Sequence, residues 1–400
     1  MKTVTDQDHI DAFLTRGVEN VFPSREFVEA RLKEGNPMTM YLGIDPTGPT
    51  LHLGHAIILR KLRAWQDLGH KVILLIGDFT GMIGDPTDKS AARKRLTHDQ
   101  VIANAAKYKE QASRFIRFDG ANAAELKYNN DWLGKMSFHD VVEVAAHFTV
   151  QQMLERDMFE RRIEEQKPIH LHEFLYPLMQ GYDSVAMDVN GEIGGNDQTF
   201  NMLAGRTLLK EMKGKEKFVI AMKLLVDPTG KKMGKSEGNM ITLEDSAQDM
   251  FGKVMSWGDG MIVGGFELLT DVPAEEVTAI SKSLIRDEVN PRDVKARLAR
   301  EVVAAFYGAD EAQKASEGFD ALFQKHEKPT EIPELAVEGE AIGLIDALVA
   351  AKMVASKGEA RRQIEQGGVK VDDEVVKDIT ATVSSGSVIQ KGKRHFVRLV

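Results

Sequence analysis

Two short apolar runs enclose an amphipathic segment near the N-terminus, and this arrangement constrains the fold more than any other feature. Residues 39–44 and 71–76 read as buried strands, and residues 51–68 between them carry apolar side chains at helical spacing. Two strands joined by a helix form a βαβ unit, and a further strand is expected over residues 218–225. We therefore predict an α/β fold built on a doubly wound, Rossmann-like parallel sheet.

Helix signals occur both inside and beyond this unit. Thr97 and Gln100 form a capping box, and another helix is expected from Ser137 to Gln152. The apolar faces of these two segments are most simply core, and in an insertion of this kind they are also compatible with an oligomer interface. Residues 273–323 read as helices with breaks at Asn290-Pro291 and at Gly308.

The segment 325–340 has the composition of a linker, with two prolines and five glutamates. A separate module lies beyond it. The predicted domains are a Rossmann-like domain with a helical insertion (1–235), a helical domain (236–325), a linker (326–342) and a small α+β module (343–400).

The composition excludes several classes of protein. The 400 residues include no cysteine, which excludes disulfides, thiolate metal sites and cysteine nucleophiles and fits a reducing compartment. The longest aliphatic run, residues 72–76, is far too short to cross a membrane, and the first ten residues show no secretion signal. We expect a cytoplasmic protein with no membrane partner.

The distribution of charge qualifies the net value of −9, which by itself argues against a nucleic-acid partner. Residues 341–400 contain ten Lys and Arg against seven Asp and Glu, a net charge of +3, so the remainder carries −12. The basic character is concentrated at the C-terminus.

The first motif with chemical content runs from Tyr41 through Thr47 to His52, Gly54 and His55. A strand, a Gly/Pro turn and a helix N-terminus together form an anion site, because free backbone N–H groups and the helix dipole attract phosphate. The two histidines are spaced i, i+3 and share a helix face. The alternative is a capped helix with two surface histidines. A zinc pair is disfavoured, since zinc-binding histidines on helices usually stand four residues apart.

The second motif is the sequence KKMGKS at residues 231–236, which contains Lys232 and Lys235 and is flanked by glycines. Lysines in a loop between glycines suit closure over a polyphosphate. Taken alone, the segment is equally a solvated basic loop. The chain has no Gly-x-x-x-x-Gly-Lys-Ser/Thr pattern, which argues against a P-loop nucleotide site.

The two motifs together, about 180 residues apart, resemble the HIGH and KMSKS signatures of class I aminoacyl-tRNA synthetases. The flanking sequences resemble the bacterial tyrosyl-tRNA synthetases: YLGIDPT before HLGH, TGMIGDP at 80–86, Tyr-x-x-x-Gln-x-x-Asp at 176–183 and GGNDQ at 194–198. The chain departs from the family pattern at Gly234, where a serine is usual, and at Asn196, where Ser or Thr is usual. Neither departure removes a charge.

The resemblance implies a role for each matching residue. At the substrate tyrosine, Tyr41 and Asp183 would bind the phenolic hydroxyl. The ammonium group would be bound by Asp85, Tyr176 and Gln180, and Gln198 would lie near the carboxylate. At the nucleotide, Gly43, Asp45, Gly54, Gly195 and Asp197 would meet adenosine, with Asp197 on the ribose. Catalysis at the phosphates would fall to Thr47, His52, His55, Lys232 and Lys235. Lys89 and Arg93 would join them, unless they belong to a solvated turn.

The residue types suit these roles on chemical grounds. A buried carboxylate is a sound acceptor for a phenol, and carboxylate, amide and phenol oxygens suit three ammonium N–H donors. The i, i+4, i+7 spacing of Tyr176, Gln180 and Asp183 places all three on one helix face, which favours a shared cavity over a polar surface stripe.

The C-terminal module resembles the small S-four-type RNA-binding module. It contains a helix with two arginines, a Gly-Gly turn and a basic hairpin. A solvated basic face is the alternative, since a charge of +3 is slight. The expected RNA contacts are Arg361, Arg362, Lys370, Lys393 and Arg394.

The resemblance implies a ligase that activates tyrosine with ATP and transfers it to tRNA(Tyr). Magnesium would arrive with ATP as substrate, and no dedicated metal site and no tightly bound cofactor are expected. DNA is not an expected partner. The family implies a homodimer. One alternative is a tryptophanyl synthetase, and the expected phenol-binding pair of Tyr41 and Asp183 argues against it. The other is an RNA-binding protein that has lost catalysis, and the intact motifs argue against it.

Overall fold

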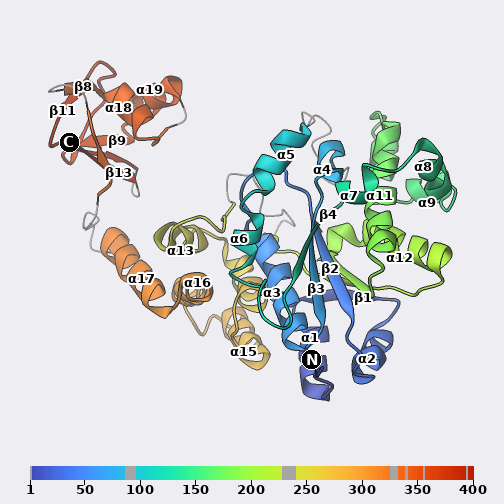
Figure 1. The fold of residues 1–400 in the computed structure, drawn as a ribbon. Coiled ribbons are helices and arrows are strands. Elements are labelled where there is room, and N and C mark those ends of the chain that lie inside the picture. The colour runs from blue at the N-terminus through green and yellow to red at the C-terminus, as the bar shows by residue number, and fades with distance from the viewer. Residues whose placement is uncertain are drawn as a thin grey trace. The chain divides into compact units, whose positions relative to one another are not determined.

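The computed structural model describes residues 2–85, 96–227, 240–324, 332–337, 341–354, 356–392 and 395–400 (Figure 1). The chain divides into two compact units, Met1–Gly308 and Ala309–Val400. Within the described residues, no helix has both the length and the apolar composition that a membrane span needs.

A six-stranded sheet forms the core of the first unit, with the strand order β1-β6-β5-β2-β3-β4. The strands from β2 to β6 run parallel, and β1 pairs antiparallel with β6 at the edge. This agrees with the predicted doubly wound parallel sheet. The strands are β1 (Val18–Phe22), β2 (Thr39–Ile44), β3 (Lys71–Ile76), β4 (Glu125–Tyr128), β5 (Gly191–Gly195) and β6 (Phe218–Met222).

Helices cover both faces of this sheet, as parallel strands require when their side chains are apolar on both sides. In Figure 1, α3 and α6 lie on one face, and α11 and α12 lie on the other. The helices up to β6 are α1 (Gln7–Thr15), α2 (Arg25–Lys33), α3 (Leu53–Asp67), α4 (Thr80–Ile83), α5 (His98–Ala105), α6 (Tyr108–Ala112), α7 (Asn130–Leu133), α8 (Phe138–Ala145), α9 (Val150–Leu154), α10 (Asp157–Glu164), α11 (Leu171–Met187), the 3-10 helix η1 (Asn196–Gln198) and α12 (Thr199–Lys213).

Several of these elements agree with the sequence predictions. The strands 39–44 and 71–76 are confirmed to the residue, and the capping box of Thr97 and Gln100 begins α5. The helix expected over 137–152 is two helices, α8 and α9. Thr149 caps the second one with Gln152, and this new capping box ends the first helix.

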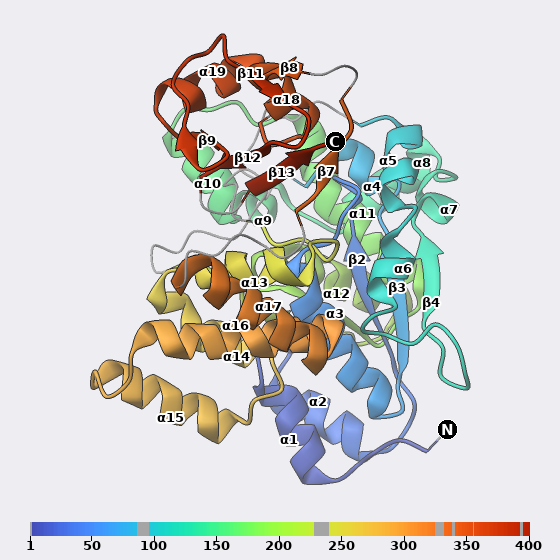
Figure 2. The ribbon, with the colours of Figure 1, turned by 90° about the vertical axis from the view of Figure 1, so that its left-hand side faces the viewer.

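A group of helices completes the first unit after the sheet. In Figure 2, α14, α15 and α16 lie beside one another. The predicted breaks are confirmed, because Asn290 caps α16, Pro291 occupies its first turn and Gly308 ends it with a positive φ of 88°. The elements are α13 (Ala247–Met255), the 3-10 helix η3 (Asp259–Met261), α14 (Ile262–Leu269), α15 (Ala274–Ile285) and α16 (Pro291–Tyr307).

The second unit has its own core, in which Leu344, Leu348, Ile364, Ile389 and Leu399 have no exposed surface. Two small sheets flank its helices, with the orders β10-β9-β12-β13-β7 and β11-β8. The elements are α17 (Ala309–Gln324), β7 (Glu334–Leu335), β8 (Ala341–Gly343), α18 (Leu344–Ala350), α19 (Lys357–Glu365), β9 (Val369–Val371), β10 (Glu374–Val375), β11 (Thr382–Ser384), β12 (Val388–Lys391) and β13 (His395–Leu399).

Strand β7 lies inside the segment predicted as a linker, 326–342. It pairs in parallel with β13, so Glu334 and Leu335 belong to the sheet of the C-terminal module and are not free linker residues. Strand β8 pairs with β11 just before the expected start of the module. The predicted domain boundaries at 235, 325 and 342 stay a prediction.

A buried histidine packs at the base of the large sheet. His70 has no exposed surface, and its ring stacks on Trp65 with 4.1 Å between centroids. Its Nδ1 accepts a hydrogen bond from the Met38 amide at 3.2 Å, while its Nε2 has no partner among the described residues. Burial lowers the pKa of His70 to about 4.

Stability should therefore fall as the pH drops below 6.5. The unfolded chain takes up a proton near pH 6.5, whereas folded His70 does so only near pH 4, so the free energy of unfolding should decrease by about 2 kcal/mol between pH 7.5 and 5. The variant His70→Asn keeps an acceptor for the Met38 amide. When its free energy of unfolding is measured by urea unfolding at the two pH values, the part of the decrease that comes from His70 should be absent. The exposed His139→Asn is the control, and an unchanged pH dependence in His70→Asn would contradict the assignment.

Candidate functional site

The topology of the sheet brings the sequence motifs to one place. The chain passes from β2 to β3 and β4 on one side of β2 and then to β5 and β6 on the other, so the order reverses between β2 and β5. In a doubly wound sheet, ligands bind outside the carboxyl ends of the strands at this point. Asp45 follows β2, and Gly195 and Asp197 stand at the end of β5. Helices α4 and α7 follow β3 and β4 at the same end of the sheet (Figure 1).

The two histidines of the first motif begin helix α3 as a reciprocal cap. His52 Nδ1 accepts from the Gly54 amide at 3.1 Å, and His55 Nδ1 accepts from the His52 amide at 3.2 Å. In a neutral ring whose Nδ1 accepts, the proton sits on Nε2, so each Nε2 is a donor. Burial and the neighbouring His52 lower the pKa of His55 well below its usual value. A Cβ on Gly54 would come within 2.9 Å of the His52 ring, so a larger residue here would displace that ring from its capping position.

The second motif lies outside the described residues, as do Lys89 and Arg93. The segment just beyond this motif, residues 241–243, pairs with the start of the histidine motif. The Leu53 amide donates to the Ile241 carbonyl at 3.1 Å and the Leu243 amide to the Leu51 carbonyl at 2.9 Å, with a β-bridge between His52 and Thr242. The described chain that resumes at residue 240 therefore lies beside the first motif.

The two residues expected at the phenolic hydroxyl are both buried. Tyr41 on β2 shares a 3.0 Å hydrogen bond with Ser184 Oγ. Asp183 on α11 accepts from Trp132 Nε1 at 2.8 Å and from Asn129 Nδ2 at 3.3 Å. Burial raises the pKa of Tyr41, and the charges of Glu192 and Asp183 raise it further. Burial also raises the pKa of Asp183, although the hydrogen bonds from Trp132 and Asn129 act to lower it.

Tyr176 and Asp45 connect the residues expected at the substrate tyrosine with those expected at the nucleotide. The Tyr176 hydroxyl donates to Asp45 Oδ2 at 2.8 Å, and Thr80 Oγ1 donates to Asp45 Oδ1 at 2.7 Å. Burial and the charge of Asp45 raise the pKa of Tyr176 well above its usual value, so its hydroxyl stays protonated. A Cβ at Gly77 would lie 1.9 Å from Asp45 Oδ1, so only glycine permits this contact.

Gln180 contacts a buried ion pair. Its Nε2 donates to Glu192 Oε1 at 3.0 Å, and Glu192 in turn pairs with Lys217. An amide that turns its NH2 group to a carboxylate directs its oxygen the opposite way. The Gln180 oxygen is therefore oriented as an acceptor.

Asp85 accepts two hydrogen bonds from other segments. Gln198 Nε2 donates to its Oδ2 at 2.7 Å, and Arg156 Nη2 donates to its Oδ1 at 3.3 Å. The structure thus brings Asp85 together with Gln198, as expected of residues that share a substrate. Arg156 is a buried cation at this position, and its guanidinium lies 5.4 Å from the Phe200 ring centroid.

The remaining predicted nucleotide residues lie at the carboxyl ends of two strands: Gly43 on β2, Thr47 just after it, and Gly195 at the end of β5. Thr47 and Gly43 are exposed, and a Cβ on Gly43 would make only ordinary contacts, so nothing in the chain itself requires glycine there. At Gly195 a Cβ would meet Asp197 Oδ1 at 2.5 Å and Leu224 at 2.8 Å. This glycine lets the Asp197 carboxylate turn back toward the end of β5.

Sequence reasoning missed several polar groups of this site, among them Asn129, Trp132, Glu192 and Lys217. None belongs to a motif recognised in the sequence. Asn129, Glu192 and Lys217 are identified by the burial of a polar group, and the half-buried Trp132 by its hydrogen bond to Asp183. Among the described residues, no three His, Asp or Glu side chains are arranged to hold a metal ion.

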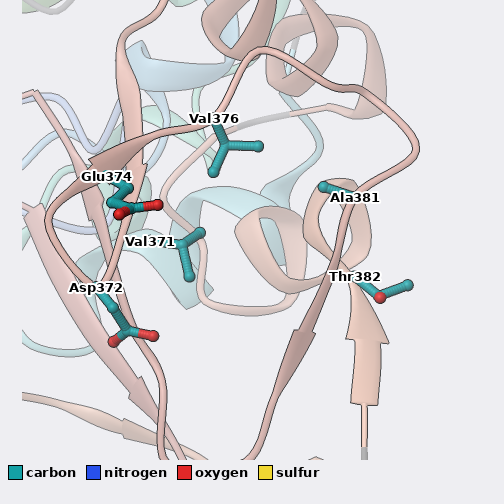
Figure 3. Close-up of a pocket in the computed structure, with 6 residues that line it drawn as sticks. All are labelled: Val371, Asp372, Glu374, Val376, Ala381 and Thr382. Atoms are coloured by element: carbon teal, nitrogen blue, oxygen red, sulfur yellow. The ribbon is translucent and has the colours of Figure 1, made fainter.

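In the C-terminal module, Arg361 and Arg362 are exposed on α19, and Lys370 lies on β9; Lys393 and Arg394 are outside the described residues. A shallow hollow on this module is lined by Asp372 and Glu374 together with Val371, Val376, Ala381 and Thr382 (Figure 3). Two carboxylates repel phosphate, so this hollow does not match the expected RNA surface.

Comparisons with known proteins identify the family of the chain. Residues 33–324 match the family model "tRNA synthetases class I (W and Y)", and residues 324–399 match the "Tyrosine--tRNA ligase SYY-like C-terminal domain". The chain is 45% identical to the tyrosine–tRNA ligase of Moorella thermoacetica over 96% of this chain and 94% of that protein. It is 44% identical to tyrosine–tRNA ligase 2 of Clostridium acetobutylicum over the full length of both.

A solved structure shares the fold of most of the chain. The C-terminally truncated mitochondrial tyrosyl-tRNA synthetase of Coccidioides posadasii aligns with a TM-score of 0.62 and 26% identity, over 78% of this chain and 92% of that one. The sheet topology, the histidine motif at α3 and the full-length matches lead to one assignment. The chain belongs to the bacterial tyrosine–tRNA ligases, within the class I aminoacyl-tRNA synthetases.

Proposed function

We propose that the ends of β2 to β5 together with α11 form one site for tyrosine and ATP. The observation that carries the proposal is the direction of the hydrogen bonds in the pocket. Tyr176 donates to Asp45 and Gln180 donates to Glu192, so both side chains keep an oxygen lone pair for an ammonium N–H. With the Asp85 carboxylate, they supply the three acceptors that an amino acid's ammonium group needs.

The phenolic end of the substrate is assigned to Asp183 and Tyr41. Trp132 and Asn129 hold the Asp183 carboxylate from its far side, and each of its oxygens retains a lone pair for a phenol. A network through Asn129 and Thr80 joins Asp183 to Asp45, since Asn129 Nδ2 also donates to Thr80 Oγ1 at 3.0 Å. The hydroxyl pocket and the nucleotide side are thereby held in one rigid arrangement.

The reaction needs positioning and charge stabilisation but no covalent enzyme intermediate. A carboxylate oxygen of tyrosine attacks the α-phosphorus of Mg-ATP, and pyrophosphate leaves. The ribose hydroxyl of the terminal adenosine of tRNA(Tyr) then attacks the tyrosyl carbonyl, and AMP leaves. We place this reaction in the cytoplasm, which the absence of cysteines favours.

The nucleotide side completes the proposal. Gly43, Asp45, Gly54, Gly195 and Asp197 would meet adenosine, with Asp197 on the ribose hydroxyls, and Gln198 would lie near the substrate carboxylate. The Nε2–H donors of His52 and His55 would stabilise the negative charge that develops on the phosphates. Thr47, Lys89, Arg93, Lys232 and Lys235 would share this task.

Asp183→Asn tests the assignment of the phenolic end. Replacing a charged acceptor by an amide should lower kcat/KM for tyrosine in ATP–pyrophosphate exchange by about 10- to 100-fold. Activity with phenylalanine, which has no hydroxyl to bind, should change far less. The control is Asp188→Asn at the end of the same helix, where the left-handed backbone, φ 50°, suits asparagine. Equal losses for both amino acids would place Asp183 outside the phenol site.

The C-terminal module is proposed to bind the tRNA backbone through Arg361, Arg362, Lys370, Lys393 and Arg394. Arg361→Glu in the full-length protein should weaken tRNA binding and reduce the salt dependence of its affinity by about one unit of slope, because one phosphate contact is lost. ATP–pyrophosphate exchange should stay normal. Lys377→Glu, an exposed lysine of the same module outside the proposed set, is the charge-matched control. If both variants lose the same affinity, net charge and not this surface determines binding.

A homodimer is proposed from the exposed apolar side chains of α8 and α11, two helices in contact with each other. Phe138 is 84% exposed and Leu171 83%, and Val142 and Leu175 follow them one turn later on the same helix faces. Apolar groups gathered in this way mark an interaction surface.

The oligomeric state tests this surface. The wild-type protein should have twice the chain mass in light scattering after gel filtration, and Phe138→Glu/Leu171→Glu should be a monomer at the same concentration, because a buried unpaired charge opposes association. Ile285→Glu, which changes a residue 79% exposed on α15, should remain a dimer. A dimeric double variant would exclude the α8 and α11 surface.

A further inference from the structure

A pair of opposite charges lies fully inside the first unit, behind the residues proposed to bind tyrosine. Lys217 immediately precedes β6 and has no exposed surface, and Glu192 on β5 is 2% exposed. Lys217 Nζ contacts Glu192 Oε2. Taking two charges out of water is so unfavourable that apolar residues of similar volume often stabilise a core at least as well. The pair therefore calls for a role besides folding stability.

The lysine makes Ser184 an acceptor in a hydrogen-bond chain that ends at Tyr41. Lys217 Nζ lies 2.8 Å from Ser184 Oγ, and an ammonium group can only donate, so the serine oxygen accepts this bond. Tyr41 Oη is the other described partner of the Ser184 hydroxyl, at 3.0 Å. With its one proton the serine can then donate to Tyr41, and in that arrangement the proton of Tyr41 points away from Ser184.

The glutamate fixes a second group of the pocket. A carboxylate can only accept, so the Gln180 side chain must turn its NH2 group to Glu192 Oε1, which lies 3.0 Å away. The amide oxygen of Gln180 then faces the opposite side. Without the carboxylate, the amide could rotate by 180° and turn its NH2 group toward a bound ammonium group. The NH2 group would then repel the ammonium group, because both are hydrogen-bond donors.

We propose that the buried Lys217–Glu192 pair positions the pocket for tyrosine: through Ser184 it makes the Tyr41 hydroxyl a donor, and directly it makes the Gln180 oxygen an acceptor. The inference rests on the roles proposed above for Tyr41 and Gln180. A phenol can accept one hydrogen bond while donating another. The substrate hydroxyl would then accept from Tyr41 and donate to Asp183, an arrangement that phenylalanine cannot use.

Ser184→Ala tests the branch to Tyr41 while it leaves the ion pair intact. In ATP–pyrophosphate exchange with the full-length protein, kcat/KM for tyrosine should fall about fivefold to tenfold, the usual effect of one misdirected neutral hydrogen bond. The value for phenylalanine should stay the same, so the tyrosine-to-phenylalanine ratio should fall by that factor. Equal losses for both amino acids, or no loss for either, would overturn this branch.

Glu192→Gln/Lys217→Met tests the branch to Gln180. The double variant removes both charges together, whereas a single substitution would leave one buried charge unpaired and threaten folding. We expect the KM for tyrosine to rise about tenfold, as for loss of a charge-assisted hydrogen bond, with kcat and the KM for ATP little changed. A folded double variant with the wild-type KM for tyrosine would show that the pair serves the core alone.

Two further variants separate the possible failures. Lys61 is a second buried lysine of this unit, and its Nζ donates to the Arg16 carbonyl at 2.8 Å; Lys61→Met should lower the melting temperature without changing the tyrosine-to-phenylalanine ratio. Tyr41→Phe should lower that ratio. If Tyr41→Phe leaves it unchanged, the proposed role of Tyr41 is wrong. If Tyr41→Phe lowers it and Ser184→Ala does not, the site stands and the positioning role of Ser184 is wrong.

Discussion

The parallel pairing of β2 with β5 on one side and β3 on the other is the constraint on which the rest of the structure depends. The pairing of β2 with β5 joins strands about 150 residues apart in sequence. Because all three strands are parallel, their carboxyl ends lie at the same end of the sheet. Asp45, Gly77 and Gly195 leave the sheet at that edge. Because a parallel sheet needs both faces covered, α3 and α12 are held against it on opposite sides, and their N-termini point at the same edge. The place proposed above for the nucleotide is therefore a consequence of the topology.

Inside this frame, polar side chains are oriented by partners that can make only one kind of hydrogen bond. A carboxylate only accepts and an ammonium only donates, so Asp45 directs Tyr176, Glu192 directs Gln180, and Lys217 directs Ser184. Burial strengthens each contact, since a misdirected polar group has no water to turn to. This preorganisation supports the proposal that these side chains present acceptors to the ammonium group of a substrate.

The sequence predicted much of this arrangement because its signals are local. The strands at 39–44 and 71–76 are short apolar runs between turns, and the capping box at Thr97 has one simple interpretation. The break between α8 and α9 was missed although Thr149 and Gln152 form the same kind of box. The helical spacing of apolar residues continues across the break. The prediction followed that spacing and not the capping box, so it joined the two helices into one. Likewise, the sequence did not predict strand β7 at Glu334 and Leu335, because pairing with β13 overrides a polar, proline-containing composition.

The sequence by itself determined which chemical groups are present and which of them belong to recognisable motifs, from Tyr41 and His52 to Asp183 and Gln198. These motifs lie on contiguous stretches whose spacing carries their meaning. The tertiary structure alone decided the partners of those groups. Asn129, Trp132, Glu192 and Lys217 are single polar residues with no motif around them, and they reach the site through space from the end of β4, from α7, from β5 and from the start of β6. The physical reason is that burial and hydrogen-bond direction are properties of packed neighbours and are not encoded in the spacing of residues along the chain.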